Sequence, residues 1–220
     1  MFNQAHKYAC KWRFRYSHKK CKVLVFGPDN NPEMSIRLGQ EVIMHSKCEQ
    51  HLGLGLITDA RQELKYIDAR IASVRSILFA IMSIGSNRVP VSPVTASKLY
   101  WSVCIPKVSY GLEIMNIGKA SLDAIEAHHI KSAKFIQGLP DQAANVGSLL
   151  AVGWQPFEFH LDYTRLIFFY RILLLPTSNI YKQVLMRCIL SMVYGTPGSA
   201  SSPAQKFLET CAKYDVQQTV

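Results

Sequence analysis

Acidic side chains are absent from the first 28 residues of this 220-residue sequence, although the same stretch holds seven lysines and arginines. A segment without carboxylates offers no ligands of the kind that Mg²⁺ or Ca²⁺ prefers, and it cannot neutralise its own cations. The basic residues alternate with four aromatic ones, and the full set is Lys7, Tyr8, Lys11, Trp12, Arg13, Phe14, Arg15, Tyr16, Lys19, Lys20 and Lys22.

A long apolar run is also missing. The most apolar segment, 166–175, is interrupted by Arg171 and followed by Pro176, so it is shorter than the roughly 20 residues that cross a bilayer. The N-terminus has no apolar core of the kind that signal peptides contain. We therefore expect an intracellular protein, in the nucleus or cytoplasm, with no membrane partner.

Paired cysteine spacing is a third absence. The six cysteines are scattered along the chain, which is typical of reduced thiols in an intracellular protein. The pattern nearest to a metal site is His45-x-x-Cys48-x-x-His51, but it lacks the two ligand pairs of structural zinc sites. We interpret it as a polar turn between strands and expect no bound metal and no small-molecule substrate.

Positive charge is what the sequence has in excess. The net charge of +10 favours a polyanionic partner, with nucleic acid as the first candidate and an anionic membrane surface as the second. The candidate phosphate contacts are Lys11, Arg13, Arg15, Lys20 and Lys22. The alternative is a solvated edge strand whose lysines prevent aggregation. Trp12 and Phe14 are expected in the core.

The apolar pattern predicts an α+β protein with a small N-terminal antiparallel β-meander followed by a mainly α-helical bundle. Strands are expected at 22–26, 35–38, 41–44 and 51–57. From Asp59, a helix N-cap, to Gly85, a stop signal, the apolar period becomes 3.6. Further helices are expected at 92–106, 121–137, 142–152, 158–175 and 179–194, then a small-residue linker and a loosely attached helix at 204–214.

The segment 8–27 resembles the reverse transcriptases of LINE-type (non-long-terminal-repeat) retrotransposons. The family has a Lys-Trp pair followed by an N-x-x-K pattern and an apolar run after its catalytic aspartates, and the corresponding residues here are Lys11-Trp12, Ser17, Lys20 and 23–26. Later stretches with similar counterparts are Leu52-Gly53, Leu99-Tyr100, Pro106, Tyr110-Gly111-x-Glu113 and Gly138-Leu139-Pro140. The resemblance covers about residues 5–175.

The resemblance implies a C-terminal portion of an RNA-directed DNA polymerase. Residues 1–58 would be the end of the palm, 59–140 a helical thumb-like region, 141–194 a C-terminal helical region and 195–220 a linker and tail. Leu52 and Gly53 would lie in the hairpin that grips the primer, and Lys20 near nucleotide phosphates. The expected partner is an RNA and DNA template–primer duplex.

Departures from the family pattern affect the expected activity. Ser17 replaces the family's Asn, His51 replaces its usual aromatic residue, and no Tyr-x-Asp-Asp turn is present. The parent reaction uses Mg²⁺, and its carboxylate ligands are absent here, so we assign no catalytic residue and no metal ligand. We expect an inactive, truncated reverse transcriptase that retains at most binding to the nucleic-acid backbone.

Three alternatives remain open at this stage: a non-functional gene fragment, a free-standing basic nucleic-acid-binding module and a basic helical protein-interaction scaffold. Basic residues on the expected helices could also face a duplex, although such residues are more often a solvated helix face; they are Lys65, Arg70, Arg75, Lys131 and Lys134. His128 and His129 are expected to be one exposed and one half-buried histidine.

Overall fold

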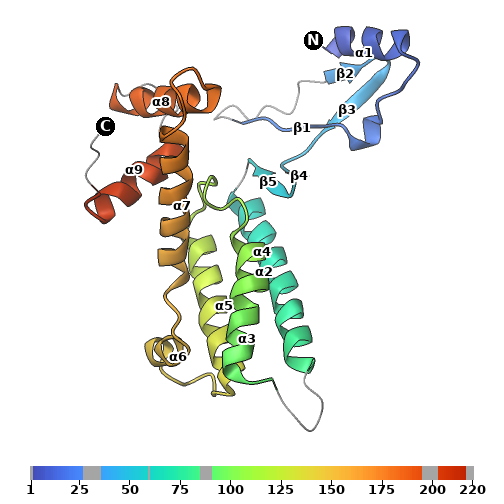
Figure 1. The fold of residues 1–220 in the computed structure, drawn as a ribbon. Coiled ribbons are helices and arrows are strands. Elements are labelled where there is room, and N and C mark those ends of the chain that lie inside the picture. The colour runs from blue at the N-terminus through green and yellow to red at the C-terminus, as the bar shows by residue number, and fades with distance from the viewer. Residues whose placement is uncertain (1, 27–35, 59, 85–90, 195–202, 217–220) are drawn as a thin grey trace. The chain divides into compact units, whose positions relative to one another are not determined.

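The computed structural model describes residues 2–26, 36–58, 60–84, 91–194 and 203–216, and it divides the chain into two compact units, Met1–Tyr66 and Ile67–Val220 (Figure 1). The first unit contains the strands and the second is helical. The expected α+β class is therefore confirmed. The finer division of the helical part stays a prediction.

The N-terminal unit begins with helix α1 (Phe2–Lys11) and a 3₁₀ turn (His18–Lys20). Three strands form a mixed sheet in which β1 (Lys22–Val23) runs parallel to β3 (Glu41–His45), and β2 (Ile36–Leu38) pairs antiparallel with β3. A turn at Gly39-Gln40 joins β2 to β3, and Gly39 has φ +67°, where a Cβ would lie 2.5 Å from the His6 ring. Helix α1 thus lies directly over this turn.

A separate two-stranded hairpin replaces the single strand that was expected at 51–57. Strand β4 (Cys48–His51) pairs with β5 (Leu54–Ile57), and the two residues between them, Leu52 and Gly53, have φ values of 51° and 80°. Two successive residues with positive φ make a tight turn whose twist matches that of the strands. Because Leu is not a usual residue in this conformation, the sequence pattern did not reveal the turn.

The first strand is shorter than expected. Regular pairing stops at Val23, and the rest of the apolar run is only partly buried, with Phe26 63% exposed. Residue 35, which the sequence placed in the second strand, lies outside the described residues. The strands also form two small sheets rather than one meander.

The helices follow the expected order. They are α2 (Ala60–Ser83), α3 (Pro93–Leu99), a π turn (Tyr100–Cys104), α4 (Ile105–Ser109), α5 (Lys119–Gln137), α6 (Asn145–Ala151), α7 (Phe157–Leu173), α8 (Ile180–Val193) and α9 (Pro203–Lys213). Ser92 caps α3 by accepting a hydrogen bond from the Thr95 N–H at 3.2 Å. Asp59 and Gly85, the expected ends of α2, lie outside the described residues.

The π turn ends at Cys104, two residues before Pro106. Proline has no N–H and cannot donate to the carbonyl one turn earlier, and here the N–H of Ile105 donates to the carbonyl of Tyr100. This wider turn lets one helix continue from α3 into α4 (Figure 1).

The core of the helical unit combines an apolar stripe on α2 with an aromatic cluster. The buried residues of this stripe are Ile67, Ile71, Val74, Leu78 and Ile81, whereas Leu64, one turn earlier, is 38% exposed. Tyr100 stacks on Trp154 with ring centroids 4.3 Å apart, and the indole Nε1 of Trp154 donates to the hydroxyl of Ser97 at 2.7 Å. These contacts connect α3 to the segment before α7.

The final helix is firmly attached, so the expectation of a loose helix is wrong. Helix α9 packs with α7 and α8 through a buried cluster of Phe169, Leu185, Ala204, Phe207 and Cys211. Apolar burial of this kind stabilises each side chain by about 1.5–3 kcal/mol. The sequence places these residues too far apart for a periodic pattern to reveal the contact.

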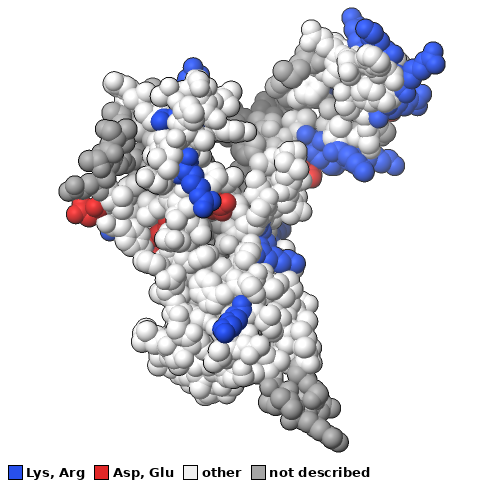
Figure 2. All heavy atoms as spheres, viewed as in Figure 1, with Lys and Arg blue, Asp and Glu red and all other residues white. Residues whose placement is uncertain are grey.

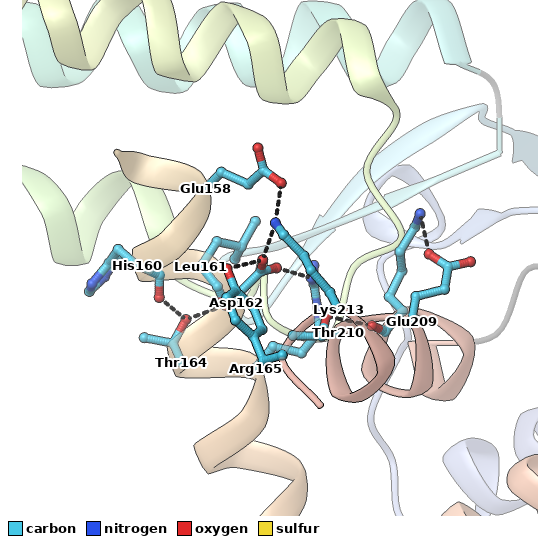
Figure 3. A network of polar contacts seen from close by, with 11 residues as sticks. Glu158, His160, Leu161, Asp162, Thr164, Arg165, Glu209, Thr210 and Lys213 are labelled. Atoms are coloured by element: carbon cyan, nitrogen blue, oxygen red, sulfur yellow. Dashed lines mark hydrogen bonds and ion pairs between the residues drawn. The ribbon is translucent and has the colours of Figure 1, made fainter. Parts of the chain in front are cut away.

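A polar network also joins α9 to α7 (Figure 3). The buried carboxylate of Asp162 accepts hydrogen bonds from Arg165 at 3.2 Å, from Lys213 at 2.8 Å and from the Tyr214 hydroxyl at 3.1 Å. Burial lowers the pKa of Arg165, an effect that Asp162 opposes, while hydrogen bonds to Asp162 and Glu158 raise the pKa of Lys213. The carboxylate is the common acceptor that holds the three donors in place.

Candidate nucleic-acid interface

The five candidate phosphate contacts all lie in the N-terminal unit, and all five are exposed. Lys11 ends α1, Arg13 and Arg15 lie in the segment after it, Lys20 ends the 3₁₀ turn and Lys22 begins β1. On the face drawn in Figure 2, Lys and Arg side chains gather over this unit. Exposed cations concentrated on one unit are the electrostatic pattern of polyanion binding.

Intramolecular neutralisation of these cations is absent among the residues that the structure describes. The ion pairs there involve Arg165, Lys206 and Lys213, all in the helical unit. Within the described part of the N-terminal unit the acidic residues are Glu41, Glu49 and Glu63, on β3, β4 and α2, and none of them forms an ion pair with these cations. The α1 region therefore keeps its positive charge available for an external anion.

Helix α1 ends in a specific backbone arrangement centred on Arg13. The N–H of Phe14 donates to the Ala9 carbonyl at 3.1 Å and the N–H of Arg13 donates to the Cys10 carbonyl at 3.3 Å. This pair of bonds is a Schellman motif, which requires left-handed backbone at the residue after the cap. Arg13 adopts it with φ 57°.

Glycine occupies the equivalent position at two other helix ends. Gly138 after α5 and Gly153 after α6 have φ values of 67° and 69° and the same two backbone hydrogen bonds. Glycine is the residue that adopts this conformation without strain. An arginine there is conformationally unfavourable, and strained backbone of this kind is more frequent at functional sites.

Four aromatic side chains lie beside the cations, and they are exposed. The exposed fractions are 56% for Tyr8, 61% for Trp12, 40% for Phe14 and 42% for Tyr16. The expectation that Trp12 and Phe14 belong to the core is therefore wrong. Both residues lie where α1 ends, and of the described residues near them only Ala9 is buried.

The candidate primer-grip residues Leu52 and Gly53 form the tip of the β4–β5 hairpin, where Leu52 is 80% exposed. Tyr66 on α2 holds this hairpin: its hydroxyl donates to the Gly53 carbonyl at 3.3 Å and accepts from the Gly55 N–H at 3.0 Å. A Cβ at position 55 would lie 2.7 Å from the Tyr66 ring. The sequence carried no signal for Tyr66, because its partners lie 11 and 13 positions earlier on another element.

The basic residues proposed for the helical region divide into two groups. Lys134 is buried and donates to the Asp141 carbonyl at 2.7 Å, and Arg70 donates to the carbonyls of Val108 at 3.1 Å and Tyr110 at 2.7 Å. Both therefore hold loops and helix ends rather than an exposed binding face. Lys65, Arg75 and Lys131 are exposed.

His128 and His129 are both buried, so the expectation of one exposed and one half-buried histidine is wrong. One ring nitrogen of His129, Nδ1, lies 3.1 Å from the Tyr100 hydroxyl, and the other, Nε2, lies 3.0 Å from the Gln155 carbonyl. Burial lowers the pKa of each histidine to about 4. Neutral, hydrogen-bonded and enclosed, His129 serves the core rather than a surface site.

The histidines, cysteines, aspartates and glutamates of the described residues form no group of three that could hold a metal ion. In the same part of the chain, no helix combines the length and apolar character needed to traverse a bilayer.

Comparison with protein-family models, with curated proteins and with solved structures found no match to this chain.

Proposed function

We propose that this protein binds nucleic acid through phosphate contacts made by its N-terminal unit. The observation that carries the proposal is the exposed basic set Lys11, Arg13, Arg15, Lys20 and Lys22, without ion-pair partners among the described residues. Phosphate neutralisation releases counterions and gives affinity that does not depend on base sequence. The ligand that the motif resemblance favours is an RNA and DNA template–primer duplex.

The proposal includes an origin and a limit on activity. We infer an origin among the LINE-type reverse transcriptases from the motifs that begin with Lys11-Trp12, and the hairpin that presents Leu52 and Gly53 supports this origin. The sequence has no Tyr-x-Asp-Asp turn, so we propose that this chain does not polymerise nucleotides and uses no Mg²⁺. Its proposed setting is the nucleus or cytoplasm.

Binding to an RNA–DNA hybrid at two salt concentrations tests the proposal. With five phosphate contacts, affinity should fall about 10²- to 10³-fold between roughly 50 mM and 200 mM salt. Absence of binding at low salt, or binding that salt does not weaken, would refute it. Metal-dependent incorporation of nucleotides by the purified chain would refute the proposed loss of polymerase activity.

A protein-interaction scaffold is the second candidate, and the exposed apolar surface of α8 favours it. Ile180, Tyr181 and Val184 are 66%, 67% and 54% exposed, and such side chains are common at protein interfaces. Salt-insensitive binding of a protein partner would support this function. A non-functional gene fragment predicts neither form of binding.

A further inference from the structure

The aromatic rings of Trp12, Tyr8, Phe14 and Tyr16 form an exposed row at the end of α1. Among the described residues, no other ring contacts this row. The ring centroids of Trp12 and Tyr8 are 6.1 Å apart, those of Tyr8 and Phe14 are 6.1 Å apart, and those of Phe14 and Tyr16 are 5.2 Å apart. The order along the row is therefore Trp12, Tyr8, Phe14 and Tyr16.

The backbone explains why these rings meet. Trp12 directly follows α1, and its N–H donates to the Tyr8 carbonyl at 3.1 Å. This bond continues the helical turn by one residue, so Trp12 lies on the same side as Tyr8, four positions earlier. The left-handed turn at Arg13 reverses the chain and brings Phe14 back to Tyr8, the apolar contact that usually accompanies a Schellman motif. The same turn that places Arg13 thus assembles the row.

The rings contact one another without stacking. The interplanar angles are 51°, 73° and 74° along the row, and an edge-on contact covers a face of only one of its two rings. Combined with exposed fractions between 40% and 61%, this geometry leaves ring faces open to solvent. Unpaired nucleic-acid bases stack on aromatic faces of this kind.

Cations lie on the same short segment as the row. Lys11, Arg13 and Arg15 alternate with the rings in sequence, and the Lys11 ammonium lies 5.9 Å from the centre of the Trp12 ring. An exposed apolar face alone does not identify a ligand. Here the rings alternate with cations that have no ion-pair partner among the described residues, so a single strand could place its bases on the rings and its phosphates beside the cations. A base pair within a duplex cannot offer its faces to such rings.

We propose that the row formed by Tyr8, Trp12, Phe14 and Tyr16 binds unpaired nucleotides by stacking, so that the protein prefers single-stranded RNA or DNA to duplex. This inference rests on the proposed nucleic-acid binding, and it replaces the duplex that the motif resemblance favours with an unpaired strand as the preferred ligand. The cations bind the phosphates of the strand. The rings stack on any unpaired base, so they select for single strands and not for a particular base sequence.

The test uses the full-length chain with two labelled probes of equal length, an oligouridine of roughly 12 nucleotides and an RNA–DNA hybrid. The single strand should bind several-fold tighter than the hybrid and quench tryptophan fluorescence, because Trp12 is exposed, whereas Trp101 is half-buried and Trp154 is buried. Trp12→Ala should weaken binding of the single strand about tenfold and binding of the hybrid less than about twofold. Trp12→Phe should preserve the affinity and abolish the quenching.

Tyr181→Ala, which removes an equally exposed ring from the helical unit, is the matched control and should leave both affinities unchanged. Circular dichroism of each variant shows that it is folded. Tighter or equal binding of the hybrid, without quenching by the single strand, would overturn this inference and leave the proposed function standing. Failure of both probes to bind would overturn both.

Discussion

Arg13 and Gly138 occupy the same position at the ends of two helices, with φ values of 57° and 67° and the same pair of backbone hydrogen bonds. The conformation suits glycine and strains arginine. The residue at the end of α5 therefore suits its backbone conformation, whereas the residue at the end of α1 does not. The two effects of Arg13 can be measured separately, because backbone strain changes the free energy of unfolding and a phosphate contact changes the affinity for nucleic acid.

Arg13→Gly should stabilise the protein and weaken its binding to nucleic acid. Relief of the left-handed strain is worth about 1–2 kcal/mol in the free energy of unfolding, and the greater freedom of glycine in the unfolded chain offsets about 0.5–1 kcal/mol of it. Urea denaturation measures the net gain. Loss of one phosphate contact should reduce the salt slope of binding by about 1. Gly138→Ala is the counterpart at α5 and should destabilise by about 1 kcal/mol. An unchanged free energy of unfolding in Arg13→Gly would contradict the claim that the backbone of Arg13 is strained.

Asp162→Asn should be strongly destabilising. The change leaves Arg165, whose side chain is 6% exposed, without its carboxylate partner, and breaking a buried ion pair from one side costs about 3–5 kcal/mol. Chemical denaturation gives the value. Glu209→Gln disrupts the more exposed pair with Lys206 on α9 and should cost less than about 1 kcal/mol. Similar losses in the two variants would show that the Asp162 network does not hold α9.

Mild acid should destabilise the helical unit through its two buried histidines. Their pKa of about 4 in the folded protein lies below the value of about 6.5 in an unfolded chain. Between these values the unfolded chain binds protons that the native protein does not, so stability is full above pH 6.5 and falls as pH decreases toward 4. Each histidine should contribute a loss of roughly 2 kcal/mol between about pH 7 and pH 5.

His129→Gln tests this pH dependence. The amide can still bond to the Tyr100 hydroxyl or the Gln155 carbonyl but does not titrate, so the loss between pH 7 and pH 5 should shrink by roughly 2 kcal/mol. Urea denaturation at the two pH values measures the difference. An unchanged pH dependence would show that His129 is not the neutral, buried group described here.

Local signals predicted the helical part of the fold well. The Ser92-Pro93 start of α3 and the Gly138 end of α5 are both read from short-range rules, and the structure confirms them. The apolar stripe on α2 depends on helix period alone. Each of these elements is determined mainly by residues within a few positions of one another.

Contacts between distant segments were not predictable in this way. The attachment of α9 depends on Asp162 and Lys213, which are 51 positions apart, and burial of His129 depends on Tyr100 and Gln155. At the candidate interface, sequence identified the cations, whereas the row of exposed rings depends on the left-handed backbone of Arg13. Arginine is not a signal for that conformation, so only the structure reveals it.

The salt dependence of RNA–DNA hybrid binding tests the central claim most directly, if the intact chain is compared with a variant in which Lys11, Arg13 and Arg15 are all changed to Gln. A matched variant changes three exposed lysines of the helical unit, Lys98, Lys107 and Lys119, to Gln, with the same loss of charge. For the intact chain we predict a slope of log affinity against log salt of about −4 to −5. The N-terminal variant should have a slope shallower by about 3, and the matched variant should keep the parent slope. Equal slopes in the two variants, or no salt-dependent binding by the intact chain, would contradict the account.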